Sequence, residues 1–220
     1  MKKLIIFDLD GTLYQFKGGS FKKSGIYEKI LKNTEKYIEK TLKKSKHEAG
    51  LILQDILKEY GDRISIGLEE KFRIDRYDYF NKVWDIPARQ FIKSNSAFLR
   101  DTLQRVNKDF DFVLVSDAPR VWMNKVLKEL KLDDIFNDRI FSGEGNVRKE
   151  FFNAFNSIKK VFNARAKECI VVGDQEETDI APAKKSGMKT IFVNKKLKSS
   201  IADYTIQNIL EIEKALKSLH

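Results

Sequence analysis

Cysteine, histidine and proline are scarce in this chain of 220 residues, which contains one, two and three of them. The single cysteine, Cys169, excludes an intramolecular disulfide and a zinc site built on several cysteines. It stands in the apolar run ECIVVGD, so we expect a small buried core residue rather than a reactive thiol. The two histidines, His47 and His220, lie far apart in the sequence. Any metal would therefore be held mainly by carboxylate and carbonyl oxygens, which favours Mg²⁺, Mn²⁺ or Ca²⁺.

Long apolar runs are missing too. None approaches the roughly 20 residues that a membrane-spanning helix needs. The first apolar run stops at Asp8 and no small-residue cleavage site follows it, so the pattern of a secretory signal is not met. We therefore expect a cytoplasmic protein that has no membrane partner.

Positive charge is in excess, with a formal net charge of +10. The excess comes mostly from lysines spread along the chain, and lysine is less suited than arginine to planar, bidentate recognition. We interpret it as a solvated surface that would attract anionic small substrates. Nucleic acid is not the expected partner.

One short apolar, strand-like run lies near the N-terminus, and four more follow in the second half of the chain. In that half they alternate with amphipathic helical stretches. Near-continuous runs of this kind are typical of a parallel sheet covered on both faces. The alternation predicts an α/β fold with a doubly wound, Rossmann-like parallel sheet. The predicted strands are Leu4–Phe7, Phe112–Val115, Cys169–Val172, Thr190–Val193 and Tyr204–Ile206, and the predicted helices lie within 119–132, 150–162 and 178–188.

The region between the first two predicted strands is different. It has no convincing strand and carries helical apolar stripes within 24–44, 47–61 and 75–87. A structureless loop of this length would be unusual, so we predict an inserted all-helical domain of about four helices. The predicted boundaries are 1–14 and 95–220 for the α/β core and 15–94 for the insertion.

Polar side chains follow the ends of the predicted strands, where ligands bind in open α/β sheets. FDLDGTLY places Asp8 and Asp10 two residues apart, so both can face one side of a continuing strand. Ser116 ends a second run, and a second acidic cluster lies in VVGDQEETDI. A cation could come from the start of the amphipathic helix at 150–162. The candidate site residues are Asp8, Asp10, Ser116, Lys149, Asp174 and Asp179.

These segments resemble the motifs of the haloacid dehalogenase superfamily. FDLDGTLY looks like its first motif, VLVS its second, the region of Lys149 its third and VVGDQEETDI its fourth, in the family's order. The helical insertion resembles the family's cap of the first type. Within it, YGDRISIGLEEKFRIDRYDYFNKV is similar to the cap of pyrimidine 5′-nucleotidase-like phosphatases.

The resemblance implies a Mg²⁺-dependent phosphomonoester hydrolase. Asp8 would attack phosphorus and form an aspartyl-phosphate. Asp10 would protonate the leaving oxygen and then deprotonate the attacking water. The metal would be held by the Asp8 carboxylate, the backbone carbonyl of Asp10 and Asp174. Dehalogenases of the superfamily lack an acid at the position of Asp10, so this residue favours phosphate esters.

The remaining candidates would support this chemistry. Ser116 and Lys149 would hold the phosphoryl oxygens, and Asp179 would orient the metal's water shell or Lys149. Lys149 lies six residues before Phe155, as expected from the family, but the neighbouring Arg148 is an open alternative.

The expected substrate is a small phosphorylated metabolite, either a nucleoside monophosphate or a sugar phosphate. Phe21, Tyr27 and Phe72 of the insertion could line a base or sugar pocket. The joints of the insertion are expected near Gly18–Gly19 and Pro87–Ser94. Two alternatives stay open: a receiver-like phosphoacceptor module, and an inactive relative that binds nucleic acid. The oligomeric state is not predicted.

Overall fold

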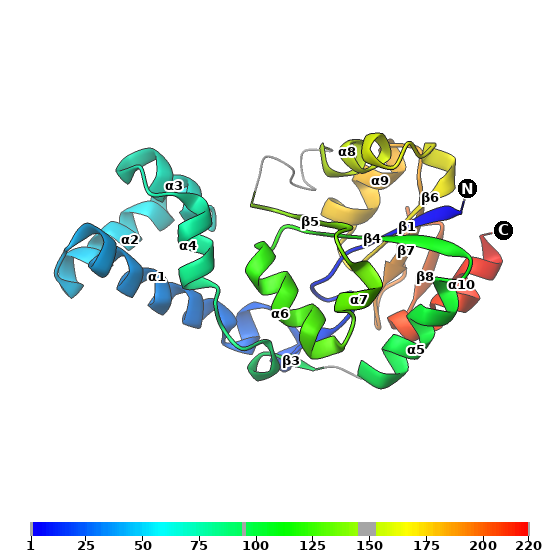
Figure 1. Cartoon of the computed structure of the whole chain (residues 1–220), viewed down its shortest axis with the longest axis horizontal. Helices are drawn as coiled ribbons and strands as arrows, with labels where there is room; N and C mark the ends of the chain where they lie inside the picture. The colour runs from blue at the N-terminus through cyan, green and yellow to red at the C-terminus, as the bar shows by residue number, and fades with distance from the viewer. Residues whose placement is uncertain (1, 94–95, 145–152, 220) are drawn as a thin grey trace.

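A computed structural model describes residues 2–93, 96–144 and 153–219 of the chain (Figure 1). Its centre is a six-stranded sheet in the order β5-β4-β1-β6-β7-β8, and every neighbouring pair is parallel. The strands are β1 (Lys3–Phe7), β4 (Phe110–Ser116), β5 (Ile140–Ser142), β6 (Cys169–Gly173), β7 (Lys189–Val193) and β8 (Tyr204–Ile206). The prediction of a doubly wound parallel α/β core is confirmed.

Side chains of β1 alternate between the two faces of the sheet, and each face is covered by helices. Ile5 and Phe7 join one apolar cluster, while Leu4 and Ile6 join another. The first cluster includes residues of α5 (Ser96–Val106), α6 (Arg120–Leu130), α7 (Asp133–Phe136) and α10 (Ile212–Ser218). The second includes residues of α8 (Asn153–Val161) and α9 (Ala181–Lys185). Burial on both faces explains the near-continuous apolar runs of the central strands, such as Leu4–Phe7 in β1 and Cys169–Val172 in β6.

Cys169 begins β6 and is buried, as the sequence predicted. Its Sγ donates a weak hydrogen bond to the backbone carbonyl of Arg165 at 3.5 Å. Burial raises the pKa of the Cys169 thiol to about 11, so the thiol stays protonated near neutral pH. Its burial and its raised thiol pKa agree with the prediction of a core cysteine rather than a reactive thiol.

The insertion contains four α-helices in its described part, the number expected: α1 (Ile26–Leu42), α2 (Lys46–Tyr60), α3 (Ile64–Phe72) and α4 (Arg76–Val83). They lie to one side of the sheet in Figure 1. The side chain of Asp75 caps α4 by accepting a hydrogen bond from the backbone N–H of Asp78 at 2.7 Å. None of the helices in the described ranges is both long and apolar enough to cross a membrane.

Two short strands that the sequence analysis did not predict lie at the ends of the insertion. β2 (Gln15–Phe16) pairs antiparallel with β3 (Ile92–Lys93), so the outgoing and returning segments run side by side. The backbone N–H of Lys17 extends this contact by donating to the carbonyl of Phe91 at 2.8 Å. The insertion is therefore attached through a two-stranded ribbon rather than through two independent loops.

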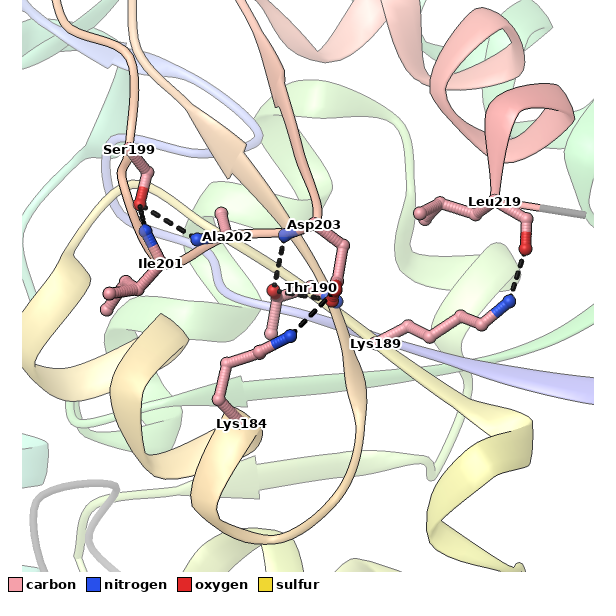
Figure 2. A network of polar contacts seen from close by, with 8 residues as sticks. All are labelled: Lys184, Lys189, Thr190, Ser199, Ile201, Ala202, Asp203 and Leu219. Carbon is pink, nitrogen blue, oxygen red and sulfur yellow. Dashed lines mark hydrogen bonds and ion pairs between the residues drawn. The ribbon is translucent and has the colours of Figure 1, made fainter.

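The last two strands of the sheet are tied together by Asp203, which precedes β8 (Figure 2). Its Oδ2 accepts hydrogen bonds from the backbone N–H and the hydroxyl of Thr190, at 2.8 and 3.0 Å. Its Oδ1 accepts from the ammonium of Lys184 at 2.7 Å. Burial by itself would raise the pKa of Asp203, but the bonds from Lys184 and Thr190 outweigh it and the pKa lies below its usual value.

Candidate active site

The three central strands bring their carboxyl ends to one edge of the sheet. Asp8 follows β1, Ser116 ends β4 and Asp174 follows β6, and β1 lies between the other two. The backbone N–H of Asp8 donates to the carbonyl of Val172 at 2.9 Å, which continues the β1–β6 ladder up to this aspartate. Predicted site residues from three distant segments thus meet at the edge where α/β sheets bind ligands.

Asp8, Asp174 and Asp179 form a compact acidic group. Each offers a carboxylate oxygen, and these oxygens lie within 4.8 Å of one another. Asp8 and Asp179 are buried, with exposed fractions of 2% and 0%. Oδ2 of Asp8 accepts a hydrogen bond from the Thr12 hydroxyl at 2.7 Å, and Oδ2 of Asp179 accepts from the backbone N–H of Gln175 at 3.0 Å. Each of these two buried carboxylates is thus oriented by a donor close to it in the sequence.

Asp179 reaches the group because of the backbone around it. It lies in a short π-helical segment, Glu176–Ile180, directly before α9. A Cβ atom placed on Gly173 would stand 2.3 Å from Oδ2 of Asp179, so a residue with a side chain at position 173 would collide with this carboxylate. The glycine at the end of β6 therefore permits the close approach of Asp179.

The carboxylate of Asp10 is not a member of this acidic group and has hydrogen-bond partners of its own. Its Oδ1 accepts a hydrogen bond from the indole N–H of Trp122 at 2.9 Å and another from the hydroxyl of Tyr14. Its Oδ2 accepts from the Ser116 hydroxyl at 2.8 Å. The Ser116 oxygen in turn accepts from the backbone N–H of Ala118 at 3.1 Å. Ser116, expected on a phosphoryl group, is here a partner of Asp10.

Tyr14 and Trp122 are site residues that the sequence analysis did not identify. Burial raises the pKa of Tyr14 well above its usual value, and the nearby Asp10 carboxylate adds to the effect. Tyr14 therefore stays protonated and available as a donor. The position of Tyr14, four residues after Asp10 in the first motif, could have indicated a role in the site. The apolar spacing of Trp122 predicts only that it lies on the buried face of α6.

The predicted phosphate-binding cation belongs to the segment before α8. Lys149 and its alternative Arg148 both lie in 145–152, outside the described residues. Phe155 on α8 is described and fully buried, as expected for the apolar face of that helix.

A cavity of about 470 Å³ lies between the insertion and the carboxyl ends of the strands. Such a volume is within the usual range for ligand pockets. Phe21, Tyr27 and Trp84 line it from the insertion, and the rings of Phe21 and Trp84 stack with centroids 6.4 Å apart. Phe72, the third aromatic residue named from the sequence, packs against the apolar core. The residues that line the cavity from the core include Asp10, Gly11, Trp122 and Asp174.

Comparison with known proteins agrees with the motifs. The family profile of the haloacid dehalogenase-like hydrolases matches residues 2–187. A relative called glyceraldehyde 3-phosphate phosphatase, from Pyrococcus furiosus, is 30% identical and is aligned over 86% of this chain and 80% of its own length. Human N-acylneuraminate-9-phosphatase is 25% identical over 53% of this chain and 50% of its own.

The fold is shared with solved structures of the same family. A HAD phosphatase from Thermococcus onnurineus superimposes with a TM-score of 0.63 over 97% of both chains, at 21% identity. The sequence motifs, the strand-end aspartates and these similarities lead to one assignment. The chain belongs to the haloacid dehalogenase-like hydrolase family, and the prediction of a phosphatase of that family is confirmed.

Proposed function

We propose that this protein is a Mg²⁺-dependent phosphomonoester hydrolase that acts through an aspartyl-phosphate on a small phosphorylated metabolite. One observation carries the proposal: the acidic group of Asp8, Asp174 and Asp179 adjoins a cavity that is also lined by Asp10. A nucleophile, a cation site and an acid must converge on one phosphoryl group for this reaction, and this edge of the sheet offers residues for all three.

The donor set supports Mg²⁺. Buried carboxylates placed this close together repel one another unless a cation or protons compensate their charge, and oxygen ligands are those that Mg²⁺ prefers. The proposed ligands are the carboxylates of Asp8 and Asp174 and the backbone carbonyl of Asp10. Asp179 would orient the surrounding water or Lys149. When bound there, Mg²⁺ supplies positive charge that offsets the repulsion between carboxylate and phosphate.

In the proposed first step, a carboxylate oxygen of Asp8 attacks phosphorus, and the bond from phosphorus to the ester oxygen breaks. Asp10 gives its proton to that oxygen, so the leaving group departs as an alcohol. In the second step Asp10 takes a proton from a water molecule whose oxygen attacks the phosphorus. Inorganic phosphate leaves and the Asp8 carboxylate is restored. Asp10 faces the cavity from which both the ester and the water would come.

Ser116 and Lys149 are proposed to hold the phosphoryl oxygens. Ser116 would exchange its present acceptor, Oδ2 of Asp10, for a phosphoryl oxygen when substrate binds. A hydroxyl can turn in this way because it rotates about its C–O bond. The exchange would leave Oδ2 of Asp10 accessible to the ester oxygen.

The insertion is proposed to act as a cap over this site, with the core at 1–14 and 95–220 and the cap at 15–94. The β2–β3 ribbon supports a joint at these boundaries. Gly18, with a φ of 76°, follows β2 within the first expected joint, near Gly18–Gly19. A cap that closes over the cavity would exclude water from the reacting phosphoryl group.

The relatives favour the sugar-phosphate alternative over nucleotides. The names of both relatives describe phosphate esters of sugar-like molecules, glyceraldehyde and N-acylneuraminate. We therefore propose a phosphorylated sugar or a closely similar polyol phosphate as the first substrate class to test, and mononucleotides as the second.

The test is a hydrolysis assay with sugar phosphates, mononucleotides and an aryl phosphate, using wild-type protein and Asp8→Asn. We expect Mg²⁺-dependent release of phosphate by the wild type, loss of activity with EDTA and recovery with added Mg²⁺. The Asp8→Asn variant should keep its fold, checked by circular dichroism, and lose nearly all activity. A substantial remaining rate in this variant would contradict the covalent mechanism, and a stable phosphoaspartate would favour the phosphoacceptor module.

A further inference from the structure

The two acids of FDLDGTLY have different surroundings, although only Leu9 separates them. Asp8 joins the acidic group, whereas the group found among the described residues does not include the carboxylate of Asp10. A flexible aspartate so near a divalent cation would be attracted into its coordination shell. Something must therefore hold the carboxylate of Asp10 away from the cation if it is to serve as an acid.

We propose that Trp122 and Tyr14 are positioning residues that hold Asp10 for proton transfer and keep it out of the metal site. The indole N–H and the phenol hydroxyl both donate to Oδ1 of Asp10. Trp122 and Tyr14 have exposed fractions of only 1% and 3%, so their packing fixes the positions of both donors. The inference rests on the proposed phosphatase function because it assigns a role in that reaction.

The partners of Asp10 also distinguish its two carboxylate oxygens. An indole N–H can only donate, so a proton placed on Oδ1 and aimed at Trp122 would have no acceptor. Oδ2 instead faces the Ser116 hydroxyl, which can turn away. Oδ2 is therefore the oxygen that becomes accessible for transferring a proton to the ester oxygen as the bond to phosphorus breaks.

Trp122 also connects Asp10 with the insertion. The ring of Trp84 packs edge-on against Trp122 with centroids 6.5 Å apart, and Phe21 stacks on the Trp84 ring at 6.4 Å. Trp84 immediately follows α4, and both tryptophans line the cavity. A substrate that contacts the aromatic side of the cavity can therefore contact Trp122, the residue whose indole N–H orients Asp10.

The first test compares leaving groups. Trp122→Phe and Tyr14→Phe each keep an aromatic ring and delete one hydrogen-bond donor to Asp10. Tyr14→Phe nearly preserves the side-chain volume, so it remains a valid test if Trp122→Phe folds poorly. We expect kcat/KM for an alkyl phosphate to fall about tenfold more than kcat/KM for p-nitrophenyl phosphate in each variant, because a good leaving group needs little protonation. A general loss of folded protein or of metal binding would lower kcat/KM equally for both esters, and equal losses in the two folded variants would overturn the inference.

Trp84→Phe is the matched control, since it also deletes an indole N–H from the cavity wall. We expect its ratio of alkyl to aryl kcat/KM to stay near that of the wild type, even if both values change. If its ratio falls as far as that of Trp122→Phe, the bond to Asp10 has no special role and the inference is wrong.

A second measurement does not depend on activity. The chain has two tryptophans, so a ¹⁵N–¹H NMR spectrum should contain two indole signals, which Trp84→Phe assigns. Asp10→Ala should move the Trp122 indole signal strongly and that of Trp84 little. A Trp122 signal that stays in place would overturn the inference, whether or not the wild type hydrolyses the esters. Failure of the proposed function would instead appear as an inactive wild-type protein.

Discussion

A Cβ atom placed on Gly11 would stand 2.2 Å from Oδ2 of Asp174. The two residues come from segments that follow neighbouring strands, β1 and β6. Gly11 also has a φ of 93°, a conformation that side-chain-bearing residues rarely adopt. The glycine after Asp10 therefore does more than permit a turn, because it makes room for the acidic residue contributed by the fourth motif.

Gly11→Ala should weaken metal binding. The added methyl group would push the Asp174 carboxylate away from Asp8, and we expect the Mg²⁺ concentration for half-maximal activity to rise about 10-fold or more, as for other changes that displace metal ligands. The measurement is a Mg²⁺ titration of phosphate release. Gly25→Ala is the control: Gly25 has a φ of 79°, but a Cβ atom added there would have no neighbouring atom within 4 Å, so the change introduces backbone strain without this collision. An equal shift in both variants would contradict the explanation.

The acidic group should also affect stability in a way that does not require catalysis. Three neighbouring carboxylates repel one another when no cation is bound, so Asp174→Asn should raise the Tm of the metal-free protein. The same change removes a ligand, so the rise in Tm on adding Mg²⁺ should become smaller. For the wild type, Mg²⁺ at 100 times its Kd corresponds to about 2.7 kcal/mol of stabilisation. The measurement is thermal unfolding with EDTA and with increasing Mg²⁺. A Tm that does not respond to Mg²⁺ in the wild type would contradict a metal site at this edge of the sheet.

The arrangement of the core could be predicted because its central strands are buried on both faces. The five predicted strands all form, since short, near-continuous apolar runs such as IVV at 170–172 are compatible with few structures other than a buried strand. The elements that were missed are mostly short. β2, β3 and β5 have two or three residues each, which is too few for an apolar period to be recognised. α5 carries Leu99 and Leu103 four residues apart and could have been predicted.

The site was predictable only in part, for a different reason. Aspartates that follow strands are visible in the sequence, and the strand order brings Asp8 and Asp174 together. The partners of Asp10 depend on where α6 packs over the sheet, which tertiary contacts decide. Trp122 has the apolar spacing of a core residue and is indeed buried, yet its indole N–H is directed to Asp10. No helical pattern distinguishes a tryptophan that only packs from one that also donates.

Asp203 should make stability depend on pH. Its pKa is lowered in the folded protein, so its stabilising contribution is fully present above the unfolded value of about 3.9 and is lost as the pH falls through the folded value. Asp203→Asn should therefore reduce the free energy of unfolding at pH 7 by about 1–2 kcal/mol. The difference from the wild type should shrink below about pH 4.

Urea unfolding at pH 7 and at pH 3.5 would check this. Asp134→Asn serves as a comparison, because Asp134 pairs with Arg100 at the surface, where its side chain is 60% exposed against 29% for Asp203. Exposed ion pairs contribute little, so its effect at pH 7 should be smaller. If the difference between Asp203→Asn and the wild type grew on acidification, the carboxylate of Asp203 would not be the stabilising form.

The aromatic residues of the insertion should separate into binding and structural roles. Phe21 lines the cavity and stacks on Trp84, whereas Phe72 is a partly buried residue packed against the apolar core. Phe21→Ala should lower kcat/KM for the preferred small phosphate ester by roughly 2- to 10-fold, the equivalent of losing an aromatic contact of about 0.5–1.5 kcal/mol. Phe72→Ala should lower the Tm and leave kcat/KM of the folded protein near that of the wild type.

The same assay tests whether the insertion limits substrate size. The cavity is bounded by the insertion on one side and by the strand ends on the other, so a small phosphate ester can fit where a polypeptide has little room. We expect kcat/KM for sugar phosphates and mononucleotides to exceed that for a phosphopeptide, and Phe21→Ala to reduce the difference because it removes part of the wall. A wild-type preference for the phosphopeptide would mean that the insertion does not act as a cap. An unchanged preference profile in Phe21→Ala would instead place the discriminating contacts elsewhere on the cavity wall.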